Sequence, residues 1–188
     1  MTTAKRKKKK TVSQHLWSLH WWMAAIYVPI FVVGAYMADL SRNVSYRGML
    51  YDFHKSLGVL TMILLAVRIF MLSIKLQRKA PPTRPKQKFD RMRRIALHTL
   101  LYIFMLGVPL SGWFFSNSFD KDVAFFGIVL PRLFIVNKGI AEFGRDMHFW
   151  LSYSFLAFIV LHTIDQWQFL RATVRRYYKA VVKKLASS

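Results

Sequence analysis

The sequence contains no cysteine and few acidic residues. Without cysteine the chain has no disulfide, no thiolate-held iron–sulfur cluster and no C-x-x-C-H motif of the kind that attaches heme covalently. Only 8 Asp and Glu residues stand against 29 Lys and Arg residues, which gives a formal net charge of +21 over 188 residues. No small-residue cleavage site follows the first apolar run, so we expect no removable signal peptide.

Four long apolar segments account for most of the 54% hydrophobic content. A helix needs about 20 predominantly apolar residues to cross a bilayer. The segments lie at about 16–38, 53–74, 95–115 and 146–170. The sequence therefore predicts an all-α membrane protein, with a four-transmembrane-helix bundle over residues 15–170, a basic arm at 1–14 and a basic tail at 171–188.

Basic residues are distributed unevenly between the connections. The arm, the second connection (75–94) and the tail carry 6, 9 and 6 Lys or Arg residues, whereas the first and third connections carry 2 and 4. The positive-inside rule therefore places both termini in the cytoplasm. The lysine-rich arm would also suit nucleic acid, but we interpret it as a solvated arm next to anionic lipid and expect no nucleic-acid partner.

Two histidines lie on one face of the fourth segment at two depths. A helix turns about 100° and rises about 1.5 Å per residue, so His148 and His162 share a face roughly 21 Å apart along the axis. His148 could be an interfacial polar residue. His162, by contrast, follows a run of apolar side chains, and a polar group at such a depth usually marks a functional site.

The alternating topology assigns a depth to the other histidines. His20 begins the first segment on the cytoplasmic side, and His54 begins the second segment on the opposite side. The depths therefore pair His54 with His148 at an outer level and His20 with His162 at an inner level. Two imidazoles at each of two levels suit two six-coordinate b-type hemes in a four-helix bundle.

Other metals fit the composition less well. Structural zinc takes four close ligands, usually including thiolates, and non-heme iron takes a carboxylate. Near the inner level only Asp165 is available, and near the outer level only Asp52, Asp146 and Glu142. The sequence therefore predicts two non-covalent heme b groups, held at the two histidine pairs.

Arg68 and three glycines accompany these histidines. Arg68 follows His54 by fourteen residues, so we expect it on the same face at the inner level. There it either snorkels to the interface or pairs with a carboxylate such as a heme propionate. Gly34 could leave space for a flat ligand, and Gly107 and Gly112 offer points of close approach.

Short motifs in all four segments match a known family. They are Ser18-Leu-His-Trp21, Phe53-His-Lys-Ser-Leu-Gly58 with Arg68, His98-Thr-Leu-Leu-Tyr102 with Pro109 and Gly112, Met147-His148 with His162, and Phe126-Gly-Ile-Val-Leu-Pro131. With these residues the sequence resembles the bacterial cytochrome b561 family of four-helix, di-heme membrane proteins over about residues 16–168. The resemblance implies heme ligands at His20, His54, His148 and His162. It places His98 at a non-ligand position, in a propionate or quinone environment, while His15 has no counterpart and is expected to be interfacial.

The resemblance also implies a bacterial inner-membrane location and a role in electron transport. Two histidines on each iron leave no open position for oxygen, which indicates electron transfer. Two functions remain open: an oxidoreductase that exchanges electrons with the quinone pool, for which the resemblance implies superoxide oxidation as one version, or a relay or anchoring subunit of a larger respiratory or dehydrogenase complex. The outer connections carry 6 basic and 6 acidic residues, so they offer superoxide no net attraction.

Overall fold

The computed structural model describes residues 11–77 and 85–186. Its long helices are α1 (Val12–Ala38), α2 (Arg47–Leu76), α3 (Pro85–Ser118) and α4 (Lys138–Asp165), and α5 (Trp167–Leu185) follows α4. A short antiparallel hairpin, β1 (Ala124–Phe125) and β2 (Ile128–Val129), connects α3 to α4. Most of the lysine-rich arm and the proline-containing stretch at 78–84 lie outside the described residues.

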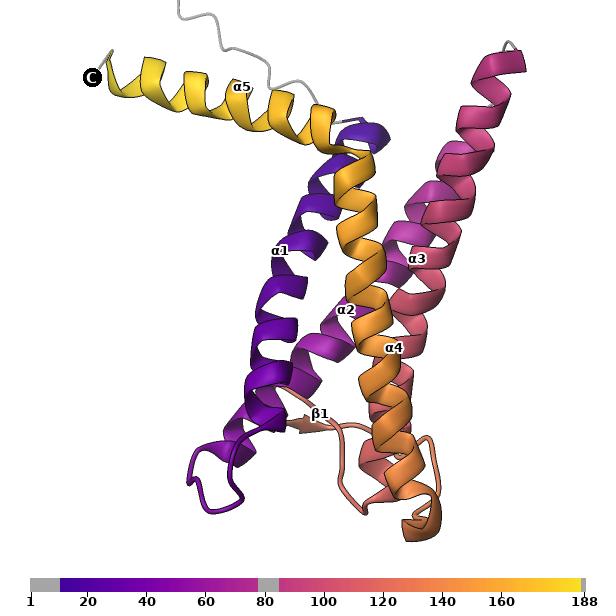
Figure 1. The fold of residues 1–188 in the computed structure, drawn as a ribbon, viewed down its shortest axis with the longest axis vertical. Coiled ribbons are helices and arrows are strands. Elements are labelled where there is room, and N and C mark those ends of the chain that lie inside the picture. Colours follow the sequence, from indigo (N-terminus) through magenta and orange to yellow (C-terminus); the bar gives the residue numbers. More distant parts are fainter. Residues whose placement is uncertain (1–10, 78–84, 187–188) are drawn as a thin grey trace, which may run out of the picture.

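Of the five helices in the described residues, four have the length and apolarity of membrane spans, as predicted. These stretches are Val12–Ala38, Arg47–Leu76, Met92–Ser118 and Lys138–Asp165. Large apolar side chains are exposed on each of them, among them Val28, Phe70, Ile103 and Trp150. In a membrane such side chains face lipid. Figure 1 shows the start of α1 and the end of α4 at one end of the bundle and the hairpin at the other, as a topology with both termini on one side requires.

The fourth predicted span, 146–170, differs from the helix at both ends. α4 begins at Lys138, where the Asn137 side chain accepts a hydrogen bond from the Gly139 N–H at 3.0 Å. It ends at Asp165, whose carboxylate pairs with Arg93 of α3 at 3.1 Å. The chain turns at Gln166 and continues as α5, so the basic tail is helical over Trp167–Leu185.

The second and third connections contain more regular structure than the sequence indicated. α2 continues to Leu76 and α3 already begins at Pro85, a residue type favoured in the first turn of a helix. In the third connection the short apolar run at 125–130 forms the hairpin, whose turn holds Phe126 at φ 46° and Gly127 at φ 91°. The connections are therefore shorter than predicted, and the helices extend beyond the hydrocarbon core.

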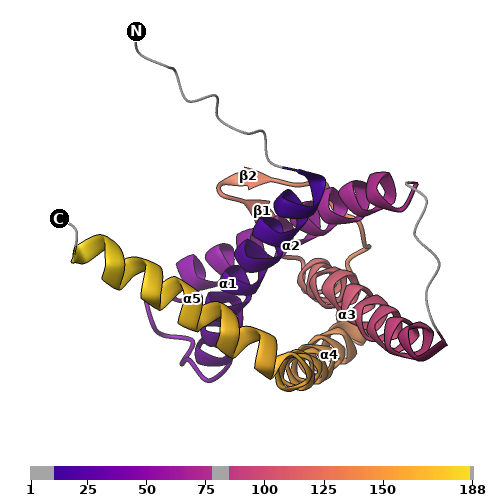
Figure 2. The ribbon, with the colours of Figure 1, turned by 90° about the horizontal axis from the view of Figure 1, so that it is seen from above.

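The helices pack as two pairs. α1 lies on α2 and α3 on α4, and α2 joins the pairs through its contact with α3 (Figure 2). Within the described ranges, the backbone of α4 approaches neither α1 nor α2 closely. Phe155 lies in the buried core between the pairs, stacked on Phe104 at a centroid distance of 5.9 Å and edge-on to Tyr27 at 5.1 Å. The space between the pairs above and below this core is where the histidines lie.

Candidate functional site

At the outer level, His54 of α2 faces His148 of α4. Their ring centroids are 6.3 Å apart and the ring planes are perpendicular, at 90°. The His148 Nδ1–H donates to the Val108 carbonyl at 3.0 Å, and the Ser111 hydroxyl lies 3.0 Å from the same nitrogen. This tautomer leaves the His148 Nε2 lone pair available. His54 Nδ1 is buried and has no hydrogen-bond partner.

Two glycines make room for these imidazoles. A Cβ added at Gly34 would lie 2.9 Å from His54 Cε1, and one added at Gly112 would lie 3.0 Å from His148 Cε1. Both distances are shorter than the optimal carbon–carbon separation of about 3.5–4.0 Å, so a side chain at either position would require the imidazole to shift. Gly34 thus leaves space for an imidazole, and the space for a flat ligand stays a prediction. Gly112 is a point of close approach as expected, but nothing lies within 4 Å of a Cβ built at Gly107.

A cavity of about 850 Å³ includes both outer histidines. Its size lies within the range of about 300–1,000 Å³ that is usual for small-molecule and cofactor sites. Apolar side chains such as Met62, Trp113 and Phe115 form much of its wall. Its lining also carries charge, with five cationic residues (Arg42, Arg47, Lys55, Lys121 and Arg145) and two acidic ones (Asp52 and Glu142). A planar apolar ligand with carboxylate substituents would match this combination.

The hairpin is fastened to α2 beside this cavity. Ser56 is buried, accepts the Phe126 N–H at 2.9 Å and lies within donor distance of the Asp52 and Ala124 carbonyls, at 2.7 and 3.2 Å. Next to it, Lys55 Nζ donates to the Asp122 carbonyl at 2.8 Å. These bonds hold the third connection against α2 at the level of His54.

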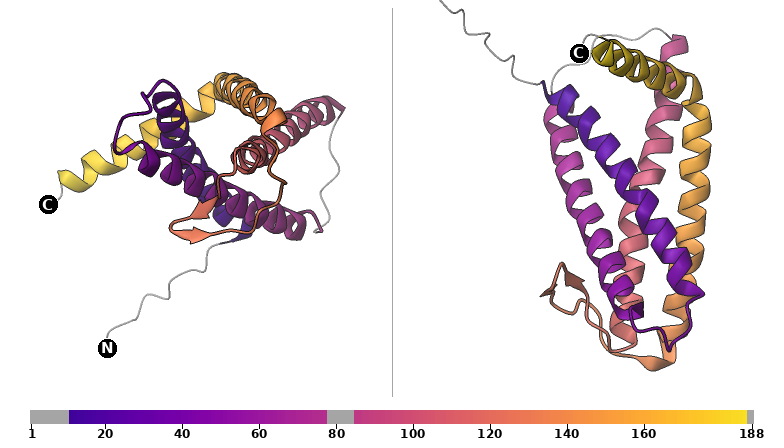
Figure 3. Two further views of the ribbon diagram at one scale, coloured as in Figure 1. Left: turned by 90° about the horizontal axis from the view of Figure 1, so that it is seen from below. Right: turned by 90° about the vertical axis from the view of Figure 1, so that its left-hand side faces the viewer.

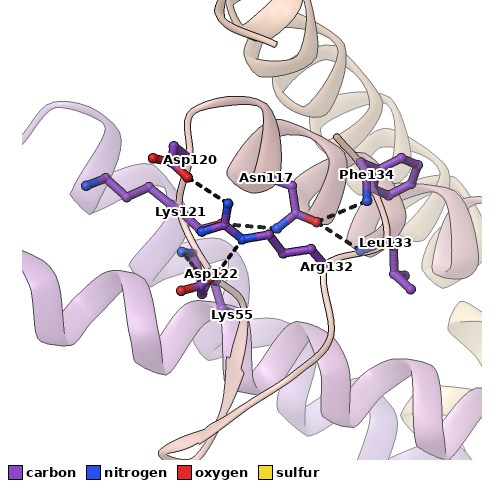
Figure 4. A network of polar contacts seen from close by, with 8 residues as sticks. All are labelled: Lys55, Asn117, Asp120, Lys121, Asp122, Arg132, Leu133 and Phe134. Atoms are coloured by element: carbon purple, nitrogen blue, oxygen red, sulfur yellow. Dashed lines mark hydrogen bonds and ion pairs between the residues drawn. The ribbon is translucent and has the colours of Figure 1, made fainter. Parts of the chain in front are cut away.

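A second network fixes the loop that follows the hairpin (Figure 4). Asn117 is fully buried; its Nδ2 donates to the Lys121 carbonyl at 3.1 Å, and its Oδ1 accepts from the N–H groups of Leu133 and Phe134. Arg132 donates to Asp120 at 2.6 Å and to Asp122 at 2.7 Å. These two charge-assisted hydrogen bonds raise the pKa of Arg132.

Two exposed arginines on the outer side, Arg132 of the third connection and Arg145 of α4, are therefore paired with neighbouring carboxylates. Arg132 pairs with Asp120 and Asp122, and Arg145 pairs with Glu142 and Asp146. The sequence left room for a cationic surface patch made of Arg132, Lys138 and Arg145. The ion pairs remove two of its three charges as a source of long-range attraction.

At the inner level, His20 of α1 faces His162 of α4. Their ring centroids are 6.2 Å apart with an interplanar angle of 85°, close to the values of the outer pair. His162 Nδ1 is buried without a hydrogen-bond partner. His98 of α3 lies beside this pair, 5.0 Å from the His162 ring, and its Nδ1 is 2.7 Å from the Arg94 carbonyl. His15, by contrast, is exposed on α1.

Arg68 lies at this inner level and is held by protein groups. Its Nε donates to the Tyr102 hydroxyl at 3.0 Å, and its Nη1 donates to the Leu16 carbonyl at 2.9 Å. Arg68 is close enough to His20 and His162 to interact electrostatically with both. A guanidinium has five N–H donors, so these two bonds leave donors for a further acceptor. These two hydrogen bonds distinguish Arg68 from an arginine whose guanidinium only extends to the membrane interface.

The two histidine pairs fit axial ligation of a metal from both sides. An imidazole nitrogen lies about 2 Å from a bound metal ion and its ring centroid roughly 1 Å behind it, so two axial imidazoles place their centroids about 6 Å apart. Both pairs meet this spacing. Across residues 11–77 and 85–186, no three His, Asp or Glu side chains gather into a metal site. The geometry thus suits a heme that supplies its own equatorial nitrogens.

Sequence reasoning missed the groups that orient His148. Ser111 and the Val108 carbonyl lie close to Pro109 on α3, and both contact His148 Nδ1. Such partners fix the orientation of a ligating histidine and increase its basicity. Ser111 directly precedes Gly112, so its place near an expected close approach was the available signal. Ser56, also missed, carries no signal beyond its place beside His54.

Comparisons with known proteins agree with this geometry. The family model of prokaryotic cytochrome b561 matches residues 14–164. The chain is similar to the protein named cytochrome b561 homolog 2 from Escherichia coli strain K12, with 29% identity over 149 residues that cover 77% of each chain. The match spans all four long helices and both histidine pairs. The chain therefore belongs to the prokaryotic cytochrome b561 family, as a multi-pass inner-membrane cytochrome b that binds heme and transfers electrons.

Proposed function

We propose that this protein binds two heme b groups, one at each histidine pair, and carries electrons across the membrane between a reaction partner at the outer face and the quinone pool. The observation that supports it most strongly is the repeated geometry of the two pairs. Their centroid separations are 6.3 and 6.2 Å, and each pair joins α4 to a helix that does not pack directly on it.

Heme would supply reversible one-electron chemistry, and the chain's residues would hold it and set its potential. His54 and His148 would be the axial ligands at the outer level, and His20 and His162 those at the inner level. The cations lining the outer cavity suit propionates, and Arg68 does so at the inner level. Phe155 and its aromatic neighbours exclude water from the space between the levels.

A test by heme extraction and redox titration separates the two sites. Acid–acetone extraction of the purified protein should release two hemes per chain. We expect His54→Ala or His148→Ala to remove one redox component, and His20→Ala or His162→Ala to remove the other. His15→Ala is the matched control because His15 is exposed and faces no partner histidine. It should retain both components.

Two outcomes contradict the proposal. A single heme per chain would exclude one heme at each pair. Loss of the same redox component from His54→Ala and His162→Ala would contradict the pairing, because the proposal places these two residues at different hemes.

The partners are tested in proteoliposomes. Quinol added to the membrane should reduce both hemes. Superoxide generated outside the vesicles should reduce the hemes only if it reacts at the outer face of the protein. The ion pairs on Arg132 and Arg145 favour a slow, weakly salt-dependent reaction with this anion. A protein that neither reduces nor oxidises quinone, but co-purifies with dehydrogenase subunits, would instead act as a relay within a larger complex.

A further inference from the structure

α5 leaves the bundle at the end of the last membrane span. The chain turns at Gln166, directly after α4, and Figures 1 and 3 show α5 lying across the end of the bundle opposite the hairpin. Among the described elements, α5 contacts only α4. The bundle therefore does not cover the sides of this helix.

One side of α5 is an exposed apolar stripe, formed by Trp167, Val174, Tyr178 and Val182. At about 100° per residue these four positions fall within roughly 80° of the helix circumference. Their side chains are 45 to 70% exposed, a fraction that water would penalise over a continuous stripe. The stripe therefore needs an apolar environment.

The side of α5 that adjoins this stripe is cationic. At about 100° per residue, Arg175, Lys179 and Arg176 follow one edge of the stripe around the helix, while Arg171 falls within the arc of the stripe itself. Arg171, Arg175, Arg176 and Lys179 line an open hollow of about 390 Å³ on this helix. The sequence of α5 contains no acidic residue that could neutralise them. Six basic residues within nineteen are too many for a membrane-spanning helix, yet the stripe is too apolar for water. A helix with these two properties is suited to the plane of a membrane interface.

We propose that α5 lies in the membrane interface, with the apolar stripe in the acyl-chain boundary and its cations on anionic lipid headgroups. The position of the helix favours lipid over an acidic protein. Trp167 follows the last residue of α4 by two positions, so α5 begins at the level of the headgroups whatever else is bound. Tryptophan is itself enriched at this level. The proposal does not depend on heme binding.

The absence of native cysteine makes the depth of α5 directly measurable. Val182→Cys places a nitroxide spin label on the apolar stripe, and Ala172→Cys places the label on the cationic side without changing the charge. The full-length protein is reconstituted into nanodiscs of phosphatidylcholine, alone or mixed with phosphatidylglycerol. Collisions of the label with lipid-soluble oxygen and with a water-soluble nickel chelate then report its depth.

In the anionic bilayer we expect the label at 182 to be accessible to oxygen and protected from nickel, and the label at 172 to behave in the opposite way. Each cation contributes about a fivefold factor to the equilibrium constant between interfacial and water-exposed α5. Substituting Arg175→Gln and Lys179→Gln should therefore lower this constant about 25-fold. A composition-matched variant exchanges Val174 with Arg176 and Tyr178 with Lys184, which moves both apolar residues to the far side of the helix at constant charge, and it should also expose the label at 182.

Three outcomes overturn the proposal. Equal access of nickel to both labels in both bilayers would place α5 in water. Equal protection of position 182 in neutral and anionic bilayers would remove the role of anionic lipid. Protection that appears only when an acidic protein is added would assign the stripe to a protein partner.

Discussion

Each outer histidine reaches the gap between the helix pairs because the residue opposite its ring has no side chain. Gly34 lies against His54 and Gly112 against His148, with 2.9 and 3.0 Å to a built Cβ. These contacts come from different helices, so the two imidazoles are positioned independently of each other. The consequence can be tested with a single methyl group.

Gly112→Ala should displace His148 and weaken the outer heme selectively. The methyl group would lie 3.0 Å from His148 Cε1 and force the ring away from the Val108 carbonyl that orients it. We expect redox titration to show loss or a shift of the outer component, with the inner one unchanged. Gly107→Ala, on the same helix but with nothing within 4 Å, is the matched control. Equal effects of the two substitutions would mean that helix propensity, not the contact, is responsible.

Arg68→Leu should lower the reduction potential of the inner heme. Positive charge near the iron favours the reduced state, and burial strengthens the effect. Removing it should lower that potential by roughly tens of millivolts, where 59 mV corresponds to a tenfold change in a one-electron equilibrium. Spectroelectrochemical titration resolves the inner and outer components separately.

Arg68→Lys serves as the charge-preserving comparison. It should keep the inner potential near that of the unchanged protein even though the lysine cannot reproduce both bonds to Tyr102 and Leu16. If Arg68→Leu leaves both potentials unchanged while two hemes remain bound, Arg68 has only a structural role.

For individual residues, the sequence indicated which side chains belong to the candidate site but not all of the contacts that they make. Fourteen-residue spacing was enough to predict that Arg68 lies at the level of His20 and His162, because helical geometry is regular over that distance. Its bonds to Tyr102 and Leu16 depend on how α1, α2 and α3 approach one another, which spacing within one helix cannot reveal. The same reason explains why Ser111 was missed as a partner of His148.

Among the elements, the hairpin is the part most dependent on a single side chain. Ser56 accepts the Phe126 N–H of the turn, and its hydroxyl lies 3.2 Å from the Ala124 carbonyl of β1. Ser56→Ala leaves the Phe126 N–H without this acceptor, at a cost of about 1–3 kcal/mol. We expect faster hydrogen–deuterium exchange at residues 124–129, measured by mass spectrometry.

Ser73→Ala is a suitable control, since the Ser73 hydroxyl donates only to Phe70 in its own helix and is exposed. It should leave exchange in the hairpin unchanged. Unaltered exchange in Ser56→Ala would show that the ion pairs of Arg132 hold the third connection in place without this hydroxyl.

The sequence predicted which segments are helical better than it predicted where each helix begins and ends. Apolar runs located all four spans because a bilayer requires about 20 such residues, but helices continue into water for as long as their backbone bonds are satisfied. α3 thus starts at Pro85 among basic residues, and α4 starts at Lys138 because Asn137 caps it. The sequence predicted α5 only as a basic tail. Its six basic residues indicate a solvated segment, and they obscure the apolar residues that recur along one side of the helix.

The molecule as a whole is two helix pairs joined mainly by α2 and α3. The matching depths of the histidines followed from topology, because alternate spans enter the membrane from opposite sides. The arrangement of the two helix pairs did not follow from topology. Nothing in the sequence indicates that α4 stays apart from α1 and α2 while the histidines of α4 face the histidines of those helices. Packing between helices decides that, and it involves contacts distant in the sequence.

This separation between α4 and its histidine partners has a consequence for how the protein matures. A ligand that binds only the folded chain stabilises it, and here the ligand would also bridge helices that the polypeptide leaves apart. Newly made chains would then depend on the cell's supply of heme to bring the two halves together. When that supply is short, the two halves would lack the link between α4 and the helices that carry His20 and His54. Such chains are the ones that membrane proteases remove, so the amount of protein would follow the availability of its cofactor.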